Sequence, residues 1–175
     1  MPTIVLRPDG DISVGNFNPS SVHGNLSDQN DSTNVFNLST NQAFSVTLDD
    51  PETLESNTIF NSFILSVRAF KSGKAADTSF DGVVRNGDSG TVYGNFSFST
   101  TSSSVVELNS ASTNFPSGTT LSDIENTFVE ITTTNNRQAI FTEIFLTIDY
   151  SEGTPPTHMN LSSGKITLSS GKITI

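Results

Sequence analysis

The sequence predicts an all-β protein, an antiparallel β-sandwich of the jelly-roll or Greek-key type, on three observations. Alternation of apolar and polar residues with a period of two recurs along the chain, and no stretch keeps the apolar period of a helix over three turns. Charged residues make up only 15% of the chain, and the abundant Ser, Thr, Asn and Gly suit turns and strand faces. Turn signals separate about ten strand-like stretches, as in sandwiches and barrels.

The first predicted strands flank short turn sequences. Residues 3–7 and 11–17 lie on either side of a Pro-Asp-Gly turn signal, and residues 34–38 and 43–48 flank Ser-Thr-Asn-Gln, which favours a hairpin. The strongest strand spans residues 59–70. Its pattern predicts one face made of Phe63, Leu65, Val67 and Ala69, opposite Ile64, Ser66, Arg68 and Phe70.

The middle of the chain predicts further strands at residues 78–85, 91–99 and 104–109, the first two joined by the loop Asn-Gly-Asp-Ser-Gly. In the second of these strands, one face is expected to bring a column of rings into the core. This face is made of Val92, Gly94, Phe96 and Phe98.

One helical turn is expected at residues 121–126, with Ser122 as the N-cap and Glu125 three residues later. Strands follow at residues 127–133 and 139–150. The last strand is expected to place one set of residues on one face, namely Ile140, Thr142, Ile144, Leu146 and Ile148. The opposite face would hold Phe141, Glu143, Phe145, Thr147 and Asp149.

The sequence divides into three parts. Residues 1–150 are expected to form the sandwich, and residues 151–159 to form an extended linker, since they contain glycine and two adjacent prolines. Residues 160–175 contain the heptapeptide Leu-Ser-Ser-Gly-Lys-Ile-Thr twice in tandem, followed by Ile175.

Two β-geometries fit this repeat. One is a hairpin in which residues 165–168 pair with residues 172–175, with Gly171 in the turn; the other is a pair of successive rungs in a β-structured stalk. A lone two-stranded hairpin is at best marginal in water, because ordering the segment costs more entropy than its few aliphatic side chains offset. The repeat is therefore expected either to stay disordered or to be completed by other surfaces.

The strict alternation of aliphatic residues favours completion by other chains, since disordered segments seldom show it. The repeat is expected to join the repeats of sister subunits, with a homotrimer favoured because three chains around an axis leave no free edge, or to augment a sheet of a partner. Lys165 and Lys172 would lie at the rim. The expected intersubunit apolar set is Leu161, Ile166, Leu168, Ile173 and Ile175.

Charge and composition exclude several functions. The formal net charge of −10 repels nucleic acid and anionic lipid, and no stretch approaches the 18 apolar residues of a membrane span. The absence of cysteine excludes disulfides and thiolate sites.

Catalytic and metal-binding signals are sparse, and we expect no enzyme. The two histidines, His23 and His158, fall in a polar loop and in the linker, and no Gly-x-Ser-x-Gly elbow is present. Glu143 and Asp149 lie six residues apart on one predicted strand, about 20 Å along it, too far for a glycosidase pair. Residues 28–34 offer oxygen ligands for Ca²⁺ at Asp28, Asn30 and Asp31, but lack the glycine and the terminal glutamate of an EF-hand.

Several segments together resemble those of small all-β structural proteins of tailed phages. These are TIVLRPDGD at the start, NDSTNVFNL, IFNSFILSVRAF with Arg68 near its end, and RQAIFTEIFLTIDY before the linker. The SSGKIT repeats are similar to short β-repeats of phage fibres and head proteins. The chain departs from that pattern in having no tryptophan, with Phe17 where the second strand of such domains often carries one.

The resemblance implies a non-enzymatic virion component, such as a capsid decoration protein, a fibre or a knob. Its partners would be other virion proteins, and it would be made in the host cytoplasm, since no signal peptide is evident. The alternative is a carbohydrate-binding or adhesive β-sandwich of a bacterial or viral surface protein, and a virion appendage can itself bind host surface glycans. The candidate exposed rings for that alternative are Tyr93, Phe80, Phe115 and Tyr150.

Overall fold

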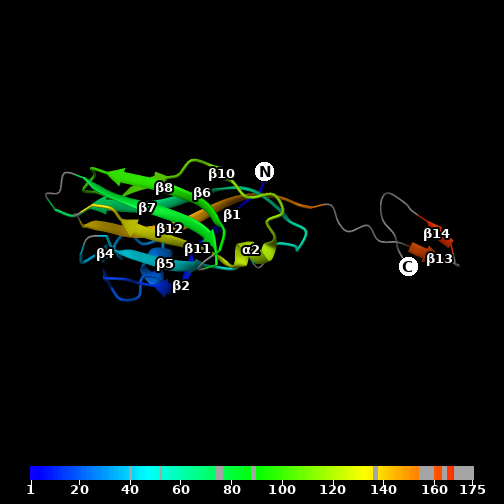
Figure 1. Ribbon diagram of the computed structural model, residues 1–175, viewed down its shortest axis with the longest axis horizontal. Coiled ribbons are helices and arrows are strands. Elements are labelled where there is room, and N and C mark those ends of the chain that lie inside the picture. Colours follow the sequence, from blue (N-terminus) through cyan, green and yellow to red (C-terminus); the bar gives the residue numbers. More distant parts are fainter. Residues whose placement is uncertain are drawn as a thin grey trace.

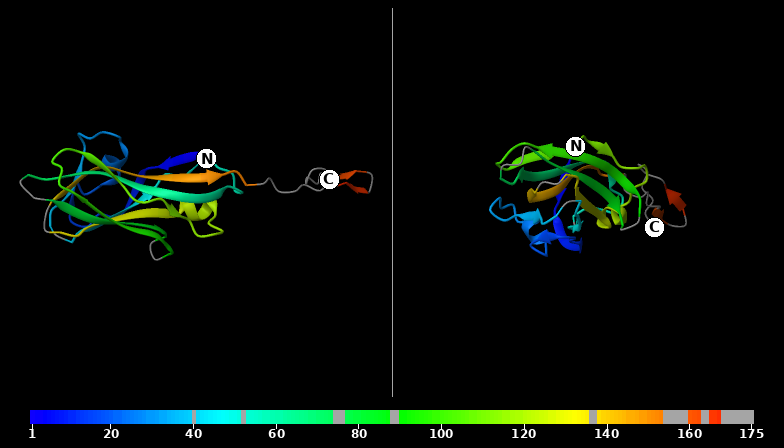
Figure 2. Two further views of the ribbon diagram at one scale, coloured as in Figure 1. Left: turned by 90° about the horizontal axis from the view of Figure 1, so that it is seen from above. Right: turned by 60° about the vertical axis from the view of Figure 1, so that its left-hand side comes forward.

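The computed structural model describes residues 1–39, 41–51, 53–73, 77–87, 90–135 and 138–153, and the strands Asn160–Ser162 and Lys165–Thr167. Residues 1–153 form two antiparallel sheets packed face to face, with two short helices (Figures 1 and 2). Each described helix has five residues, and none is long or apolar enough to span a bilayer.

The first sheet has seven strands and is centred on its two longest, β6 (Ile59–Lys71) and β12 (Ala139–Ser151). These two pair antiparallel along their whole length, which joins distant parts of the sequence. The remaining strands flank them: β1 (Thr3–Leu6), β3 (Phe17–Asn18), β4 (Val35–Asn37), β9 (Val106–Asn109) and β10 (Thr113–Asn114).

The second sheet has five strands in the order β2-β5-β11-β7-β8. Its central strand β11 pairs with β5 on one side and with β7 on the other. The strands are β2 (Pro8–Ser13), β5 (Ala43–Leu48), β11 (Thr127–Thr133), β7 (Thr78–Asn86) and β8 (Val92–Thr100).

The strand order confirms the predicted jelly roll. Four strands of one sheet run in the order β4-β12-β6-β9, and four of the other run β5-β11-β7-β8. Along the chain these eight strands alternate between the sheets except at the hairpin β7–β8. This interleaving is that of two Greek keys wound into a sandwich.

One predicted hairpin, at Ser-Thr-Asn-Gln, and the predicted Pro-Asp-Gly turn are instead crossings between the sheets. β4 and β5 belong to different sheets, and so do β1 and β2. The Pro-Asp-Gly sequence lies inside β2, whose pairing with β5 is irregular on either side of Gly10 and Asp11. Turn residues mark where the chain bends, but they do not distinguish a hairpin from a corner between layers.

The core lies between the inner faces of the sheets. The predicted inner face of β6, from Phe63 to Ala69, is buried as expected. Ring pairs tie the sheets together, with Phe80 and Phe141 packed edge to face at 4.9 Å and Phe44 and Phe141 at 5.7 Å. Such pairs add about 0.5–1.5 kcal/mol each beyond their buried area.

The closing strand β12 differs from its predicted pattern. A register shift between Phe141 and Glu143 places a β-bulge at Thr142, and one extra residue exchanges the two faces of a strand. Phe141 is therefore buried in the same core as Ile144, whereas Ile140 is only half-buried. The predicted faces are wrong before the bulge and correct immediately after it.

The predicted ring column on β8 is confirmed for two of its members. Phe98 is buried and stacks on Phe80 at 5.3 Å, and Phe96 packs edge to face on Phe63 at 6.0 Å. A register shift beside Tyr93 pairs Val92 with Arg85, which leaves Val92 exposed rather than in the column.

The helices were predicted only in part. Helix α2 (Leu121–Glu125) confirms the expected turn, but its N-cap is Thr120, not Ser122. Thr120 and Asp123 form a capping box, with 3.2 Å from the Asp123 N–H to the Thr120 hydroxyl and 2.8 Å for the reciprocal bond. Helix α1 (His23–Ser27) lies in what was expected to be a loop and buries Leu26.

The described part of the repeat is a separate two-stranded sheet. Strand β13 (Asn160–Ser162) pairs antiparallel with β14 (Lys165–Thr167), with Leu161 opposite Ile166. Residues 165–167 therefore pair with residues preceding them. Their predicted partners at 172–175 lie outside the described residues, as do linker residues 154–159.

Candidate functional site

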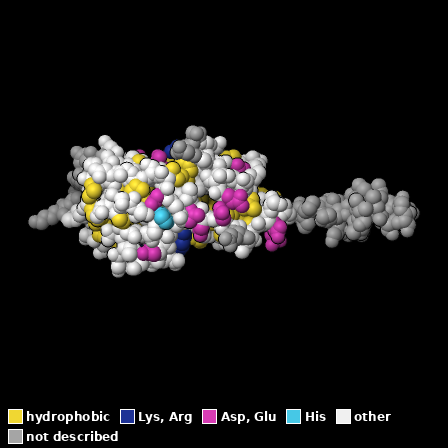
Figure 3. All heavy atoms as spheres, turned by 90° about the horizontal axis from the view of Figure 1, so that it is seen from below, with side chains coloured by type: hydrophobic (Ala, Val, Ile, Leu, Met, Phe, Trp, Pro, Cys, Tyr) yellow, Lys and Arg dark blue, Asp and Glu magenta, His cyan; other side chains and the backbone are white. Residues whose placement is uncertain are grey.

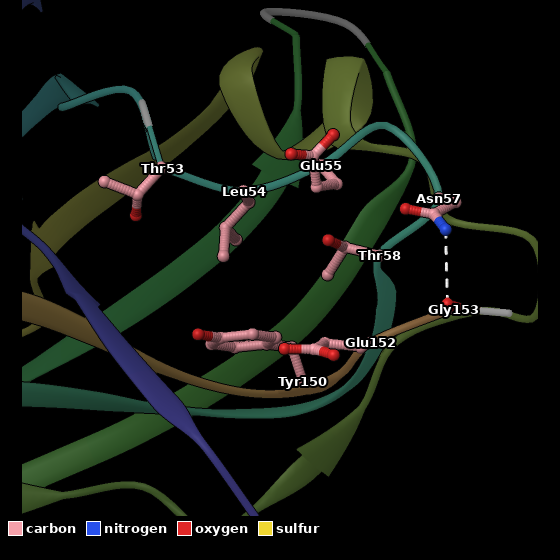
Figure 4. Close-up of a pocket in the computed structure, with 8 residues that line it drawn as sticks. All are labelled: Thr53, Leu54, Glu55, Asn57, Thr58, Tyr150, Glu152 and Gly153. Atoms are coloured by element: carbon pink, nitrogen blue, oxygen red, sulfur yellow. Dashed lines mark hydrogen bonds between the residues drawn. The ribbon is translucent and has the colours of Figure 1, made fainter. Parts of the chain in front are cut away.

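Two adjoining cavities lie at the end of the sandwich where β12 ends. The first, of about 210 Å³, is formed by the β5–β6 connection and the end of β12 (Figure 4). Its lining is Thr53, Leu54, Glu55, Asn57, Thr58, Tyr150, Glu152 and Gly153. The second, of about 350 Å³, is lined by residues 56–60 and 115–120, so that Asn57 and Thr58 border both.

Local backbone features set the wall of the first cavity. A register shift between Asp149 and Tyr150 interrupts the pairing of β12 with β6 next to the cavity. Beyond it, the Asn57 side-chain amide donates to the Gly153 carbonyl at 3.2 Å. A Cβ at Gly153 would lie 1.7 Å from the Asn57 carbonyl oxygen, so only glycine fits. The chain leaving β12 is thus fixed against the β5–β6 connection.

The first cavity is acidic. The side chains of Tyr150 and Glu152 lie on one side, and those of Leu54 and Glu55 on the other (Figure 4). No lysine, arginine or histidine is among its lining residues. Its volume is below the 300–1,000 Å³ typical of sites for drug-sized ligands, so it suits a single side chain or one sugar ring.

Of the four rings expected to be exposed, only Tyr150 lines one of these cavities while remaining half-buried. Phe80 and Phe115 are buried, so the expectation that they are exposed is wrong. The sequence alone does not show which parts of the fold cover these two rings. Tyr93 is half-buried against Phe115, with ring centroids 5.3 Å apart.

The environment of Tyr93 perturbs its phenol. Burial is the largest influence and raises the pKa of Tyr93, and the nearby carboxylate of Asp123 raises it further. Hydrogen bonds from Asn86 and Thr127 act in the opposite direction and are outweighed. The phenol is therefore neutral at ordinary pH and does not act as an anion.

The structure brings Ser21, His23 and Asp11 together, which sequence analysis did not foresee. The Ser21 hydroxyl donates to Asp11 at 2.8 Å, and His23 Nδ1 lies 3.1 Å from the same carboxylate and 3.4 Å from Ser21 Oγ. In a catalytic triad, serine and aspartate contact opposite ring nitrogens, whereas here both contact Nδ1. The cluster is not arranged as a triad.

The Asp11 carboxylate instead caps α1, accepting from the N–H groups of Val22 and His23. Desolvation, the largest single influence, raises the pKa of Asp11, but the hydrogen bonds from Ser21, His23 and Val22 together lower it below its usual value. The cluster stabilises the fold around α1.

The oxygen atoms proposed as calcium ligands have protein partners. Asp31 pairs with the Arg68 guanidinium at 2.9 Å and accepts from Thr142 at 3.0 Å. Asp28 accepts from the backbone N–H of Asn30 at 2.9 Å. Within the part of the chain that the structure describes, no three His, Cys, Asp or Glu side chains are grouped to hold a metal. These contacts fasten the loop to the first sheet.

An ion network crosses the outer face of the first sheet. Glu143 is 5% exposed and pairs with Arg7 and with Arg68, the latter at 3.4 Å, while Arg68 also holds Asp31. The Arg7 guanidinium lies over the Phe145 ring at 5.2 Å. Each of the two carboxylates pairs with a guanidinium, so the network links four segments of the chain.

The structure places two of the five residues expected at the assembly interface. Leu161 and Ile166 are register partners in the pairing of β13 with β14. Leu168, Ile173 and Ile175 lie outside the described residues. Sequence reasoning missed the Tyr150 cavity, whose only local signal is a glycine just after the last strand of the sandwich.

Comparisons with known proteins add the fold context. No protein-family model and no curated protein matches the chain. A truncated AlyQ with CBM32 and alginate lyase domains is 16% identical, with a TM-score of 0.45 over 93% of this chain and 38% of that one.

Two further solved structures show the same level of similarity. The C-terminal family 22 carbohydrate-binding module of Clostridium thermocellum Xyn10B is 15% identical, with a TM-score of 0.41 over 84% of this chain and 80% of that one. The Tobacco streak virus coat protein is 14% identical, with a TM-score of 0.37 over 89% and 90%. At these identities and TM-scores the likeness carries no function over to this chain.

Proposed function

We propose that this chain is a non-enzymatic structural protein that joins copies of itself through its C-terminal repeat, as a component of a virus particle. One observation carries the proposal: the repeat forms a two-stranded sheet whose outer edges have no strand beside them among the described residues. Such a sheet is marginal in water, and its free N–H and C=O groups are a template for further strands.

Every described residue of the sandwich core precedes the repeat. The apolar core cluster extends from Leu6 to Ile148, with Ile4 and Tyr150 packed against it. Both sheets of the sandwich are completed by residues that precede Gly153. The repeat is thus an addition to residues 1–153, the body of the molecule. Association between copies is a function that accounts for the alternating aliphatic residues of the repeat.

The distribution of charge supports contact between copies. All 18 acidic residues and six of the eight basic residues precede residue 154, which gives that part a formal charge of −12. The remaining residues carry Lys165 and Lys172 and no acidic side chain, a formal charge of +2. Figure 3 shows one face of the body with many acidic and few basic side chains. The repeat of one copy is therefore attracted to the body of another.

The virus particle is the setting that the sequence resemblance favours. Two of the segments similar to phage structural proteins, residues 59–70 and 139–150, lie in the central strands β6 and β12 of the first sheet. The body would be displayed outward, and assembly would take place in the host cytoplasm with other virion proteins.

The test is the mass of the protein in solution. Light scattering is expected to give a multiple of 18.7 kDa for the full chain, three copies being the favoured number, and a single copy after deletion of residues 160–175. Circular dichroism should show that the shortened chain keeps its β-sheet signal. Equal masses for the two proteins would remove the proposal.

Glycan binding is the second candidate, favoured by the Tyr150 ring in a cavity with two carboxylates and the Asn57 amide. A glycan array with and without Ca²⁺ would test it. Saturable binding that Tyr150→Ala abolishes and Tyr93→Ala retains would place a sugar at this cavity. Absence of binding to any glycan on the array would count against this second candidate.

A further inference from the structure

The two edges of the five-stranded sheet differ in how they are protected. The edge strand β2 contains Pro8, Asp9 and Asp11 and has two irregularities in its pairing with β5. Proline, charge and bulges are the features by which proteins prevent strands from adding to an edge. This edge is closed to further pairing.

The opposite edge strand, β8, is nine residues long and contains no charged residue and no proline. It lies at the margin of the sheet away from β2 (Figure 1) and pairs with β7 alone. No backbone hydrogen bond joins its outer side to a described residue. Its one irregularity, beside Tyr93, leaves residues 94–100 in regular register. Such an edge is a template for another strand.

The two faces of β8 differ in polarity. Phe96 and Phe98 face the sandwich, where Phe96 is only half-buried beside Phe63. Asn95, Ser97 and Ser99 are exposed on the outer face, with Ser97 bonded to Asp81 of β7 at 2.7 Å. A strand added to this edge would need apolar residues on one face and polar or basic residues on the other.

We propose that the free edge of β8 is the acceptor for β14 of a second copy, so that the β13–β14 sheet extends the five-stranded sheet of its neighbour. This inference rests on the proposed function and names the partner surface. Main-chain hydrogen bonds supply the attraction, and the alternation of side chains supplies the specificity.

The sequence of the described hairpin has the required alternation. Leu161 is the register partner of Ile166, and Ile166 stands between the polar residues Lys165 and Thr167 in the sequence. A strand of this sequence added to β8 would carry the apolar residue on one face and the two polar residues on the other. When β14 lies beside β8, its apolar face continues the Phe96 side of the sheet. Lys165 then lies on the face that carries Asp81, an attraction consistent with the opposite charges of repeat and body.

A second copy is the favoured donor because of the sequence between body and repeat. Pro155 and Pro156 follow closely after Gly153, and adjacent prolines favour an extended chain. Exchange of an identical segment between copies is a low-cost route to association, so a second copy is the donor that we favour.

The first experiment places charge on the acceptor edge. Asn95→Lys combined with Ser99→Lys is expected to reduce the full chain to the mass of a single copy, as deletion of residues 160–175 does. The matched control is Ser13→Lys, an exposed serine on the protected edge β2, which should leave the assembly intact. Circular dichroism checks that each variant is folded.

The outcomes separate this inference from the proposed function. Loss of assembly on deletion of the repeat but not in the β8 variant would overturn the acceptor and retain the proposed function. Loss in the β8 variant but not on deletion would mean that β8 edges pair with each other, which overturns both. A second measurement covers the case in which the double variant does not fold.

That measurement uses the absence of cysteine in the chain. Proteins carrying Ser99→Cys or Asn95→Cys are mixed with a protein carrying Thr167→Cys and oxidised. Disulfide-linked peptides joining β8 to β14 are expected by mass spectrometry, because paired strands bring Cα atoms within about 6 Å of each other. Links no more frequent than with Ser13→Cys would overturn the proposal.

Discussion

The body and the repeat use β-structure in opposite ways. In the body, every long strand has a buried inner face, and the two central strands of the first sheet pair over their whole length. In the described part of the repeat, two three-residue strands pair with each other and with no other described strand. Backbone hydrogen bonds between strands thus build a complete sandwich in the body, whereas in the repeat they build a two-stranded sheet that is marginal alone. The comparison shows that alternation of residues makes a strand, while burial of one face decides whether the strand is stable alone.

The largest loss of stability is expected from a substitution in the core of the body. Phe141→Ala removes a fully buried ring that contacts Phe44 and Phe80. The free energy of unfolding, measured by urea denaturation, should fall by about 3–5 kcal/mol because a cavity is left in the core. Phe145 lies on the outer face and is half-buried, so the matched variant Phe145→Ala should lower the free energy of unfolding by clearly less. Equal losses would contradict the position of the bulge at Thr142.

The ion network should give the next largest effect. Glu143→Gln removes the buried carboxylate that holds Arg7 and Arg68. We expect the free energy of unfolding to fall by about 1–3 kcal/mol, less than for a fully buried pair, because both guanidinium groups still reach solvent. A loss that disappears in 1 M salt would show instead that the pairs are screened surface contacts.

A smaller effect is expected at the cap of α2. Thr120→Ala should lower the free energy of unfolding by about 1 kcal/mol, because the Asp123 N–H loses its acceptor. Ser122→Ala is the control and should change it by less than about 0.5 kcal/mol. A larger loss of unfolding free energy for Ser122→Ala than for Thr120→Ala would show that Ser122 is the N-cap.

The stability of the body should also depend on Asp11 at acid pH. Because the folded-state pKa of Asp11 is lowered, its contribution is present above the unfolded value and is lost as the pH falls through the folded one. The urea midpoint should therefore fall as the pH is lowered from about 5 through the folded-state pKa of Asp11, which lies below 3.8, and it should fall less steeply in Asp11→Asn. Parallel profiles for the two proteins would show that the cap does not act through this carboxylate.

A substitution in the repeat is expected to have the smallest effect on the stability of the body and the largest effect on assembly. Ile166→Asn should change the free energy of unfolding of the body by less than about 0.5 kcal/mol, since both sheets of the body are formed by strands that end at or before Ser151. Light scattering of the same protein should give the mass of a single copy. A variant that unfolds the body would show that the two regions are coupled within one chain.

The predictable parts of the molecule are those in which alternation runs unbroken. The predicted face of β6 from Phe63 to Ala69 is correct because no irregularity falls within those residues. The register shift between Asp149 and Tyr150 skips Asn61 of β6, which precedes them. The bulge at Thr142 has no compositional signal, so the first residues of β12 were placed on the wrong faces. The hairpin expected at Ser-Thr-Asn-Gln was wrong, because the choice between hairpin and crossing depends on contacts with distant strands.

The local motifs show the same limit at shorter range. Thr120…Asp123 and Ser122…Glu125 both have the spacing of a capping box, and only the geometry selects the first. Helix α1 has five residues, too few for a periodic signal, and it depends on Asp11 from another element. The Tyr150 cavity is formed by segments about 90 residues apart in the chain, which no local pattern reports.

Amide hydrogen exchange of the assembled full chain tests the central claim most directly. The account predicts that the amides of Asn160–Ser162 and Lys165–Thr167 are protected at high protein concentration and lose that protection on dilution. The amides of the body should stay protected throughout. Exchange of the repeat at the rate of a free peptide at every concentration would contradict the account.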